Sequence, residues 1–514
     1  MDQKIINQFL KLNKLKFSKY ETKNNILLVD RGNIDPIIRS SIAAEIFNKL
    51  KKSNVIVLLD DNKKSWSEEI YKSFGVVEFY RIPSIRKFYK FPFLFVQSFL
   101  TFLIKYINFL LFKDFRWFID NFKVDNIHLG DLIYDSYLRY DLKFLNKKKI
   151  DIKFLKILFN SIFKFYFIKN LILNNSVNQL IVNSATYVQN SSIALRIGVK
   201  KKIPSIFMAW FLIIFYDDYK RLFTSRQKVL PEHVESTNLP NNWFSLYEKY
   251  SKSRYVGKIE HPDFINAYKN KKIVDFNELL KSIQIGDLKY NKIVLIAPHA
   301  FSDASHESFL NLFDDFYDHF ISTLNHIKKN RNLDDVLWLV NPHPSSHVYN
   351  EEGLVAKIIQ DYNLNNLKLF PQNLNVYSAL KVVDTVITCN GTIGLEFPAC
   401  FEKKAILAGD APYSGNKFNL EPKTKEEYFK YLDNIKNINS MTNQEKILAK
   451  KTFYFYECLM LESDITSIIP SNRFLRPEEF LNYIIKQLSE KDLKDDPFYN
   501  QIYKQIQNHL NKNK

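Results

Sequence analysis

Glycine and cysteine are both scarce in this chain of 514 residues. The 11 glycines are roughly 2% of the chain, where about 7% is usual. Neither a P-loop (G-x-x-x-x-G-K-[ST]) nor a dinucleotide fingerprint (G-x-G-x-x-G) occurs in the sequence. The three cysteines, Cys389, Cys400 and Cys458, form neither a disulfide framework nor a C-x-x-C metal site. We therefore expect reduced thiols in a cytoplasmic protein, without either of those phosphate-binding loops.

Two motifs common in metal enzymes are also missing. The sequence has no H-E-x-x-H and no Asp-x-Asp, which predicts no metal site and no cofactor. Residues 1–16 contain no small-residue cleavage site, so no signal peptide is expected.

Negative charge is under-represented. Lys and Arg number 73 against 55 Asp and Glu, a net charge of +18. This excess favours anionic partners such as nucleic acid, acidic lipid headgroups or phosphorylated substrates, although it also matches the Lys-rich usage of AT-rich genomes. No RNA-recognition, KH, zinc or helix-turn-helix signature occurs, so we expect no nucleic-acid partner.

Two apolar stretches carry interspersed lysines. Residues 91–112 (FPFLFVQSFLTFLIKYINFLLF) approach the length of a membrane-spanning helix, but Lys105 lies near the middle. Residues 150–173 again mix lysines with Phe, Ile and Leu. This mixture favours helices at the surface of an anionic membrane. Buried core helices and a true spanning helix are the two alternatives.

The remaining apolar residues predict strands alternating with helices. In the N-terminal half, strands are expected at 26–29, 55–59, 179–182 and 205–208, with helices around 37–50 and 192–197. In the C-terminal half, strands are expected at 293–297, 336–340, 367–370, 385–388 and 405–408. Helices are expected between them at 309–327, 353–362, 376–383 and 393–400. Such regular alternation predicts an α/β fold with doubly wound parallel sheets.

Polar residues cluster where the C-terminal strands end, which is where open α/β sheets bind ligands. Single turns of this kind often contain helix caps, but four such turns favour a binding cleft. The candidate residues for nucleotide binding are His299, Ser302, Asp303, His343, Pro344, Ser345, Asn390, Gly391, Thr392, Glu396, Asp410 and Tyr413.

Residues 390–396 (NGTIGLE) are the most informative of these turns. Gly391 and Gly394 permit close approach of the backbone, and Thr392 is placed to cap the next helix. The start of that helix predicts a phosphate site; the alternative is a capped helix with Glu396 near its positive end. Pro344 favours an extended backbone at His343. The His343 side chain is then placed either to donate a hydrogen bond to a phosphate or to order its own loop.

Several of these segments resemble a known family. Residues 297–306 (APHAFSDASH) resemble the first donor-domain turn of bacterial capsule polysaccharide biosynthesis proteins. Residues 341–344 (NPHP) resemble the His-Pro element of that family and of bacterial sialyltransferase-like enzymes. Residues 390–396 and 404–413 resemble its next two turns, except that relatives often carry a serine pair where this chain has Asn390-Gly391.

The resemblance implies a GT-B glycosyltransferase similar to Kdo transferases and sialyltransferase-like enzymes. We expect two facing Rossmann-like domains with parallel sheets, plus an apolar, basic helical insertion in the N-terminal half. The domains expected are residues 1–285 on the acceptor side with membrane-contacting helices, 286–425 as the nucleotide-sugar domain, and 426–514 as a helical tail packing back on them.

The donor that this resemblance implies is a CMP-activated Kdo or sialic-type sugar, with UDP and GDP sugars left open. The acceptor that it implies is a lipid-linked or polysaccharide glycan, and we expect a cytoplasmic protein, peripheral at the inner face of the cytoplasmic membrane. The alternatives are a nucleotide-sugar 2-epimerase, a polyol-phosphate transferase, or a non-catalytic scaffold of the polysaccharide machinery.

An inverting transfer needs a base for the acceptor hydroxyl. Asp131 and Asp135, in residues 130–139 (GDLIYDSYLR), are the candidates from the N-terminal half. The alternative for Asp131 is a helix cap. Arg139 is the candidate for holding an anionic acceptor, or else it pairs with a carboxylate.

Overall fold

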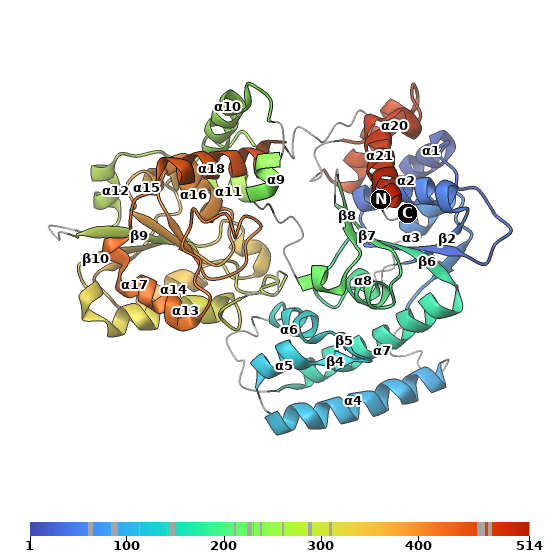
Figure 1. Ribbon diagram of the computed structural model, residues 1–514, viewed down its shortest axis with the longest axis horizontal. Helices are drawn as coiled ribbons and strands as arrows, with labels where there is room; N and C mark the ends of the chain where they lie inside the picture. Colours follow the sequence, from blue (N-terminus) through green and yellow to red (C-terminus); the bar gives the residue numbers. More distant parts are fainter. Residues whose placement is uncertain are drawn as a thin grey trace. The chain divides into compact units, whose positions relative to one another are not determined.

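The computed structural model separates the chain into two compact units. It describes residues 1–59, 65–83, 91–112, 114–140, 142, 150–209, 212–223, 229, 231–236, 239–259, 262–285, 290–307, 311–459, 468–470 and 475–512. Unit 1 comprises Met1–Tyr137, Lys148–Leu222 and Glu462–Lys514, and unit 2 comprises Leu138–Lys147 and Phe223–Leu461. Figure 1 shows a sheet flanked by helices in each unit.

This division differs from the expected domain boundaries in several places. Residues 138–147 and 223–285, expected with the N-terminal domain, belong to unit 2. The expected tail, 426–514, is divided: its first part stays in unit 2, whereas 462–514 return to unit 1. Long-range packing, which local sequence patterns do not record, produces these differences.

Unit 1 is built on a sheet with the order β3-β2-β1-β6-β7-β8 among the described residues. All neighbouring pairs are parallel except β7 and β8, which are antiparallel. The central strands β1, β2 and β6 are mostly buried runs of Val, Ile and Leu, as parallel sheets covered on both faces require. The strands of this sheet are β1 (Asn25–Val29), β2 (Asn54–Leu58), β3 (Glu78–Tyr80), β6 (Val177–Val182), β7 (Ser205–Ala209) and β8 (Leu212–Tyr216).

Helices from both ends of the chain cover this sheet. The C-terminal helices pack against the N-terminal ones, and both termini lie on unit 1 (Figure 1). The helices are α1 (Gln3–Leu12), α2 (Ile34–Lys51), α3 (Ser65–Ser73), α8 (Asn190–Lys200), α20 (Pro477–Leu488) and α21 (Pro497–Lys512).

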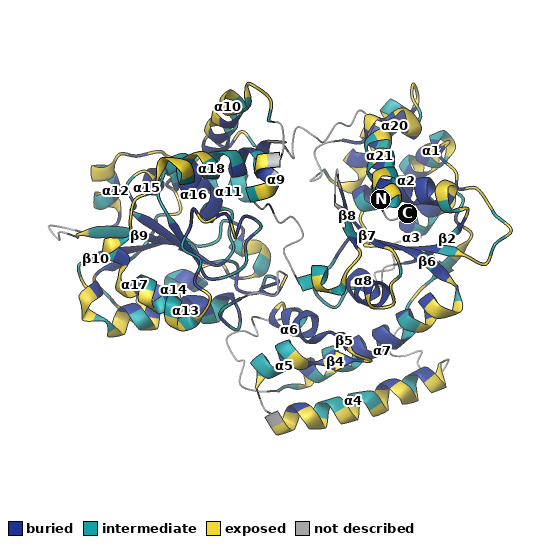
Figure 2. Cartoon of the chain, viewed as in Figure 1, coloured by how far each residue is buried: buried dark blue, intermediate teal, exposed yellow. Residues whose placement is uncertain are grey.

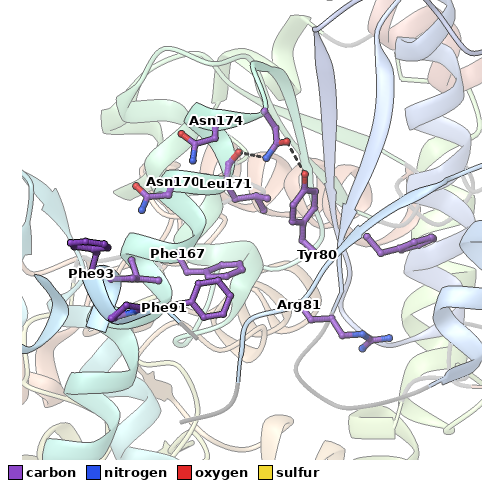
Figure 3. A pocket seen from close by; sticks show the side chains of 12 residues that line it. Tyr80, Arg81, Phe91, Phe93, Phe167, Asn170, Leu171 and Asn174 are labelled. Carbon is purple, nitrogen blue, oxygen red and sulfur yellow. Dashed lines mark hydrogen bonds between the residues drawn. The ribbon is translucent and has the colours of Figure 1, made fainter. Parts of the chain in front are cut away.

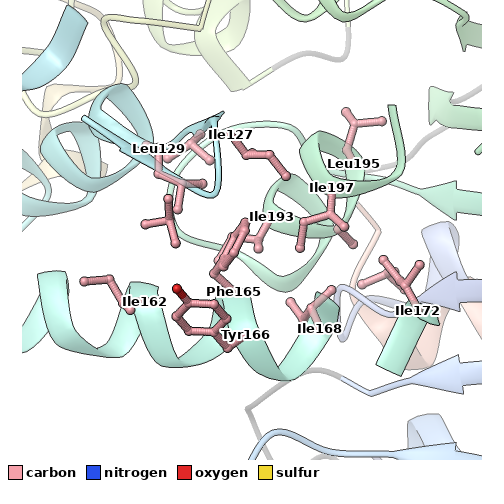
Figure 4. Close-up of a cluster of buried hydrophobic side chains, with 14 of the residues drawn as sticks. Ile127, Leu129, Ile162, Phe165, Tyr166, Ile168, Ile172, Ile193, Leu195 and Ile197 are labelled. Carbon is pink, nitrogen blue, oxygen red and sulfur yellow. The ribbon is translucent and has the colours of Figure 1, made fainter. Parts of the chain in front are cut away.

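The expected helical insertion lies between β3 and β6. It contains α4 (Pro92–Phe112), α5 (Phe115–Asn121), an antiparallel pair β4 (Lys123–Val124) and β5 (Ile127–His128), α6 (Gly130–Leu138) and α7 (Ile152–Asn174). Buried side chains of α7, including Phe165 and Ile168, pack with Ile193 and Ile197 of α8 (Figure 4). Most of the expected membrane-contacting stretch 150–173 is therefore a core helix of unit 1.

Unit 2 has the sheet order β11-β10-β9-β12-β13, with every neighbouring pair parallel. The strands are β9 (Lys292–Ile296), β10 (Val336–Val340), β11 (Leu367–Leu369), β12 (Thr385–Thr388) and β13 (Ala405–Leu407). The helices are α9 (Pro231–Ser236), α10 (Trp243–Tyr255), α11 (Pro262–Tyr268), α12 (Phe276–Ser282), α13 (Phe316–Lys329), α14 (Leu354–Tyr362), α15 (Tyr377–Leu380), α16 (Ile393–Phe401), α17 (Lys425–Asp433) and α18 (Asn443–Phe453).

The predicted fold class is confirmed: both units have Rossmann-like sheets, in which the order of the parallel strands reverses beside the first strand. Several local expectations differ, and β3 is one strand that was not expected. The antiparallel β8 was not expected, nor was the short β4–β5 pair. The helix expected from residue 309 begins at Phe316, because Asp315 caps it by accepting a hydrogen bond from the Asp318 N–H at 2.8 Å. Residues 308–310 lie outside the described residues.

Candidate functional site

The strand order of unit 2 reverses between β9 and β12. The segments leaving these two strands run in opposite directions, and sheets of this type bind ligands in a crevice at such a reversal; we call this position the crevice of unit 2. Thr388, at the end of β12, donates from its hydroxyl to the Ala297 carbonyl after β9 at 3.1 Å. This bond holds the two strand ends together beneath the crevice.

His299, two residues beyond Ala297, lies at this crevice. Its ring stacks on Phe316 at a centroid distance of 4.3 Å, with 17° between the planes. Its Nε2 is buried and has no hydrogen-bond partner in the protein. Burial, followed by the neighbouring His343, lowers the pKa of His299 to about 4. The imidazole is thus neutral at pH 7 and retains one unused polar atom.

His343, which follows β10, lies beside His299 with 6.2 Å between ring centroids. Its Nδ1 accepts a hydrogen bond from the Ser345 backbone N–H at 3.2 Å. Burial lowers the pKa of His343 below its ordinary value. Because Nδ1 is an acceptor, the neutral ring carries its proton on Nε2, which makes that atom a hydrogen-bond donor.

The turn after β12 contains both glycines singled out above. A Cβ on Gly391 would lie 2.9 Å from the Thr388 hydroxyl and 3.3 Å from His299 Nε2. A Cβ on Gly394 would collide with the Tyr413 hydroxyl and would lie 2.6 Å from Leu407 Cδ2. Tyr413 is fully buried and donates to the Gly391 carbonyl. The protein's own side chains therefore leave no room for a Cβ at either glycine, and Tyr413 packs beneath the turn.

Thr392 does not cap α16 as expected. The side chain makes no capping bond to the helix backbone; its hydroxyl donates instead to Glu396 Oε1 at 2.9 Å. Glu396 is buried in an ion pair with Arg254 of α10 and accepts from Tyr268 of α11 at 3.1 Å. Arg254 also lies 3.1 Å from Glu457. The Glu396 carboxylate therefore ties three helices together beneath the turn.

The loop after β9 is held by a carboxylate that sequence reasoning missed. Glu351 is 4% exposed and accepts from the backbone N–H groups of Phe301 and Ser302, each at 2.7 Å. The Ser302 hydroxyl donates to the same carboxylate at 2.7 Å. Burial raises the pKa of Glu351. Ser302 is thus occupied in shaping the loop, and Asp303 accepts from the Ala304 N–H at 2.8 Å.

Other predicted residues lie in the same strand-end loops. Ser345, which Pro344 precedes, is buried and donates to Asp263 of α11. Asn390 and Asp410 are partly exposed in the loops that follow β12 and β13. The Arg139 guanidinium lies over the Tyr349 ring at 4.1 Å, within unit 2.

Asp131 and Asp135 belong to unit 1, and each is 2% exposed. Both Asp131 oxygens accept from the Arg196 guanidinium, Oδ1 at 2.6 Å, and His128 Nδ1 lies 3.1 Å from Oδ1. Burial acts to raise the pKa of Asp131, but Arg196 and His128 hold it well below its usual range. This geometry is that of a structural ion pair at the first turn of α6 rather than of an accessible base.

Within the described ranges, no group of three or more His, Cys, Asp or Glu side chains is arranged to hold a metal ion. The crevice instead offers two neutral imidazoles, a glycine-lined turn and the positive end of a nine-residue helix, in which the N–H groups of Gly394, Leu395 and Glu396 already bond the Gly391 and Thr392 carbonyls. The helix dipole and the Ile393 N–H at its start favour a phosphate or another anion.

The site also contains three residues that no sequence signal identified: Glu351, Arg254 and Phe316. Glu351 is about 50 residues from the loop it holds, and Arg254 is 142 residues from Glu396. Contacts over such separations leave no local pattern. A helix start after Asp315 was the one available hint for Phe316, which directly follows that cap.

Comparison with known proteins adds a fold likeness. No family model matches the chain, and no curated protein matches it. Among solved structures, the Kdo transferase KpsC of Thermosulfurimonas dismutans is similar at 15% identity and TM-score 0.34, over 54% of this chain and 79% of that one. A UDP-GlcNAc 2-epimerase of Neisseria meningitidis is similar at 11% identity and TM-score 0.24, over 86% and 98%. A glycosyltransferase of Rickettsia africae is similar at 13% identity and TM-score 0.25, over 95% and 100%.

Glycosyltransferases and nucleotide-sugar epimerases of the GT-B class are therefore among the structural neighbours of this chain. At these identities and TM-scores the likeness carries no argument about activity. The function has to be argued from the crevice itself.

Proposed function

We propose that this protein is a GT-B glycosyltransferase whose nucleotide-sugar donor binds in the unit 2 crevice. The observation that carries the proposal is the unpartnered Nε2 of His299, which faces the Gly391 turn at the start of α16. A buried polar atom without a partner is costly unless a ligand supplies one. A phosphate oxygen at the helix start supplies that partner.

The phosphate is proposed to take hydrogen bonds from the Ile393 N–H, which begins α16, and from Nε2–H of His343, since the N–H groups of Gly394, Leu395 and Glu396 are bonded within the turn. These donors stabilise the negative charge that develops on the leaving nucleotide, which is the task a metal performs in other transferases. Glu396 and Tyr413 hold the turn rather than the ligand, given their buried partners. We therefore propose a metal-independent transfer in which turnover persists in the presence of EDTA.

The donor we propose is a CMP-activated Kdo or sialic-type sugar, following the resemblance of the His343 and Asn390 turns to capsule enzymes. The acceptor is a lipid-linked or polysaccharide glycan made on the cytoplasmic side of the membrane. A base is needed for the acceptor hydroxyl. The buried Arg196 pair argues against assigning that role to Asp131, and Asp135 stays a candidate.

Calorimetric titration with CMP, UDP and GDP tests the donor site. His343→Ala should weaken binding of the preferred nucleotide at least tenfold, about 1.4 kcal/mol, because the phosphate loses a donor. The matched control is His347→Ala, an exposed histidine four residues along the same loop, which should bind as the wild type does. Equal nucleotide affinities of the two variants would show that the phosphate does not bind in this crevice.

Incubation of the activated sugar with and without an acceptor glycan separates transfer from isomerisation. A transferase forms a glycosylated acceptor and leaves the unused donor sugar unchanged. Conversion of the donor to an isomeric sugar without acceptor would instead identify an epimerase, and binding without any turnover would identify a scaffold.

A further inference from the structure

An apolar face runs along the whole of α4 on unit 1. Its side chains recur every three or four residues, so they lie on one side of the helix. Phe93 is 91% exposed and Ile104 60%. The apolar face consists of Phe93, Val96, Phe99, Leu100, Leu103, Ile104, Ile107, Leu110 and Leu111. Figure 2 shows exposed residues all along this helix. A continuous apolar surface of this kind marks an interaction site.

The opposite side of α4 is packed against α7 along its length. Phe95 and Phe102 contact Phe159 with centroid distances of 5.8 and 5.7 Å, and Phe109 contacts Phe154 at 5.5 Å. The other side of α7 lies in the core of unit 1. By length and hydropathy, residues Pro92–Leu111 are also a candidate membrane span. To span a bilayer, however, α4 would have to leave α7 and expose these rings to water.

The charges of the two helices indicate which surface the apolar face meets. Neither α4 nor α7 contains an Asp or Glu, while together they carry Lys105, Lys153, Lys156, Lys164 and Lys169, of which Lys169 pairs with Asp125 of the preceding segment. For a protein partner, we would expect charges of both signs on these helices. Lysines beside an exposed run of Phe, Leu and Ile instead fit an anionic bilayer.

A cavity of about 580 Å³ opens at the start of α4. Its walls combine aromatic rings from three elements, including Phe79, Phe91 and Phe167, with the amides Asn170 and Asn174 (Figure 3). Phe91 and Phe167 meet edge to face with centroids 6.0 Å apart. Phe93 lines the cavity and also belongs to the apolar face, so the two surfaces are continuous.

We propose that α4 is an in-plane anchor on an anionic membrane and that the cavity takes up one hydrocarbon chain of a membrane lipid. The apolar face inserts to the depth of the headgroup–acyl boundary, about 5 to 10 Å, while α7 keeps the helix parallel to the surface. The amides at the cavity mouth hydrogen-bond the ester region of the same lipid. This membrane contact goes beyond the proposed sugar transfer and does not depend on the donor site.

Sedimentation of the full chain with vesicles tests the anchor. Phosphatidylglycerol-containing vesicles should bind the protein at 0.1 M salt, and 1 M salt should weaken binding as charge is screened. Ile104→Glu should reduce binding at least tenfold. Ile447→Glu, on unit 2 with similar exposure (53%), should bind as the wild type does. Protein that stays in the supernatant, or equal binding of both variants, would overturn the anchor.

Two further measurements distinguish the occupants. Alkaline carbonate should release an in-plane anchor, whereas retention would indicate a spanning helix and overturn the proposal. A stable dimer in which Ile104→Glu restores monomers, without vesicle binding by the wild type, would assign the face to a second copy of the chain.

For the cavity, the single-residue variant Phe167→Trp places a fluorophore on its wall. Acyl chains brominated at mid-chain should quench it when vesicles are bound. Bound protein with unquenched Trp would retain the anchor and overturn the uptake of a chain.

Discussion

The ion pair of Asp131 and Arg196 stabilises unit 1 only while both partners are present. Arg196 is 5% exposed, so its charge is removed from water almost completely. Breaking a buried pair by changing one partner costs about 3 to 5 kcal/mol, because the other charge stays buried without compensation. The Asp131 carboxylate also contacts Nδ1 of the buried His128 ring.

Asp131→Asn should therefore lower the unfolding free energy at pH 7 by several kcal/mol, on the order of a broken buried pair. The matched control is Asp120→Asn, whose exposed pair with Arg116 should matter by about 1 kcal/mol or less. Urea denaturation of both variants measures the difference.

The loss of stability in Asp131→Asn should depend on pH. Because the folded state holds the pKa of Asp131 low, its contribution is present above the unfolded pKa, about 3.9, and is lost as pH falls below that value. The stability difference from the wild type should shrink in acid. A stable, folded Asp131→Asn protein that binds donor yet has no turnover would instead restore Asp131 as the base.

At the scale of elements, the start of α16 depends on what lies behind it. Gly394 is packed against Tyr413 and Leu407 of the neighbouring loop and strand, and its carbonyl accepts from Asn419 at 2.7 Å. The turn is thus shaped by side chains from beyond β13, and the position of the proposed phosphate site follows from that packing.

Gly394→Ala should destabilise the protein by about 1 to 3 kcal/mol, the usual cost of overpacking a filled site, and should weaken nucleotide binding. The collision is with the Tyr413 hydroxyl, so adding Tyr413→Phe should recover part of the loss. A double-mutant cycle on thermal unfolding measures that coupling. Strict additivity of the two substitutions would show that Tyr413 does not set the position of the turn.

At the scale of the whole molecule, the last part of the chain completes the first unit. The helices α20 and α21 bury apolar side chains against α1, α2 and β8. Arg39 of α2 lies over the Phe498 ring at 5.0 Å. The buried apolar residues of the two helices include Phe480, Leu481, Ile484, Ile485, Leu488, Phe498, Ile502 and Ile506.

A chain ending at residue 461 should therefore fail to fold unit 1. Each of those side chains contributes about 1.5 to 3 kcal/mol when buried. Their summed contribution is therefore comparable to the whole stability of a typical domain, about 5 to 15 kcal/mol. Limited proteolysis should degrade residues 1–222 of the shortened chain while residues 223–461 resist. A chain ending at residue 512 is the control. Protection of unit 1 without the tail would contradict this role.

The sequence by itself determined most strands of the two sheets, most helices and the strand-end turns of the α/β fold, but not β3, β8 or the β4–β5 pair. Runs of Val, Ile and Leu broken by polar turns are local signals, so β10 and β12 were predicted with their observed bounds. It also predicted which turns carry His299, His343 and Gly391, because parallel strands bring their carboxyl ends to one edge.

Only the tertiary structure decided what those side chains do. It made Thr392 a partner of Glu396, gave Asp131 a buried arginine, and returned residues 462–514 to unit 1. It also separated two apolar helices of similar composition, burying one side of α7 in the core and leaving the apolar face of α4 open. Burial and ion pairing depend on partners tens to hundreds of residues away, and no local spacing in the sequence records them.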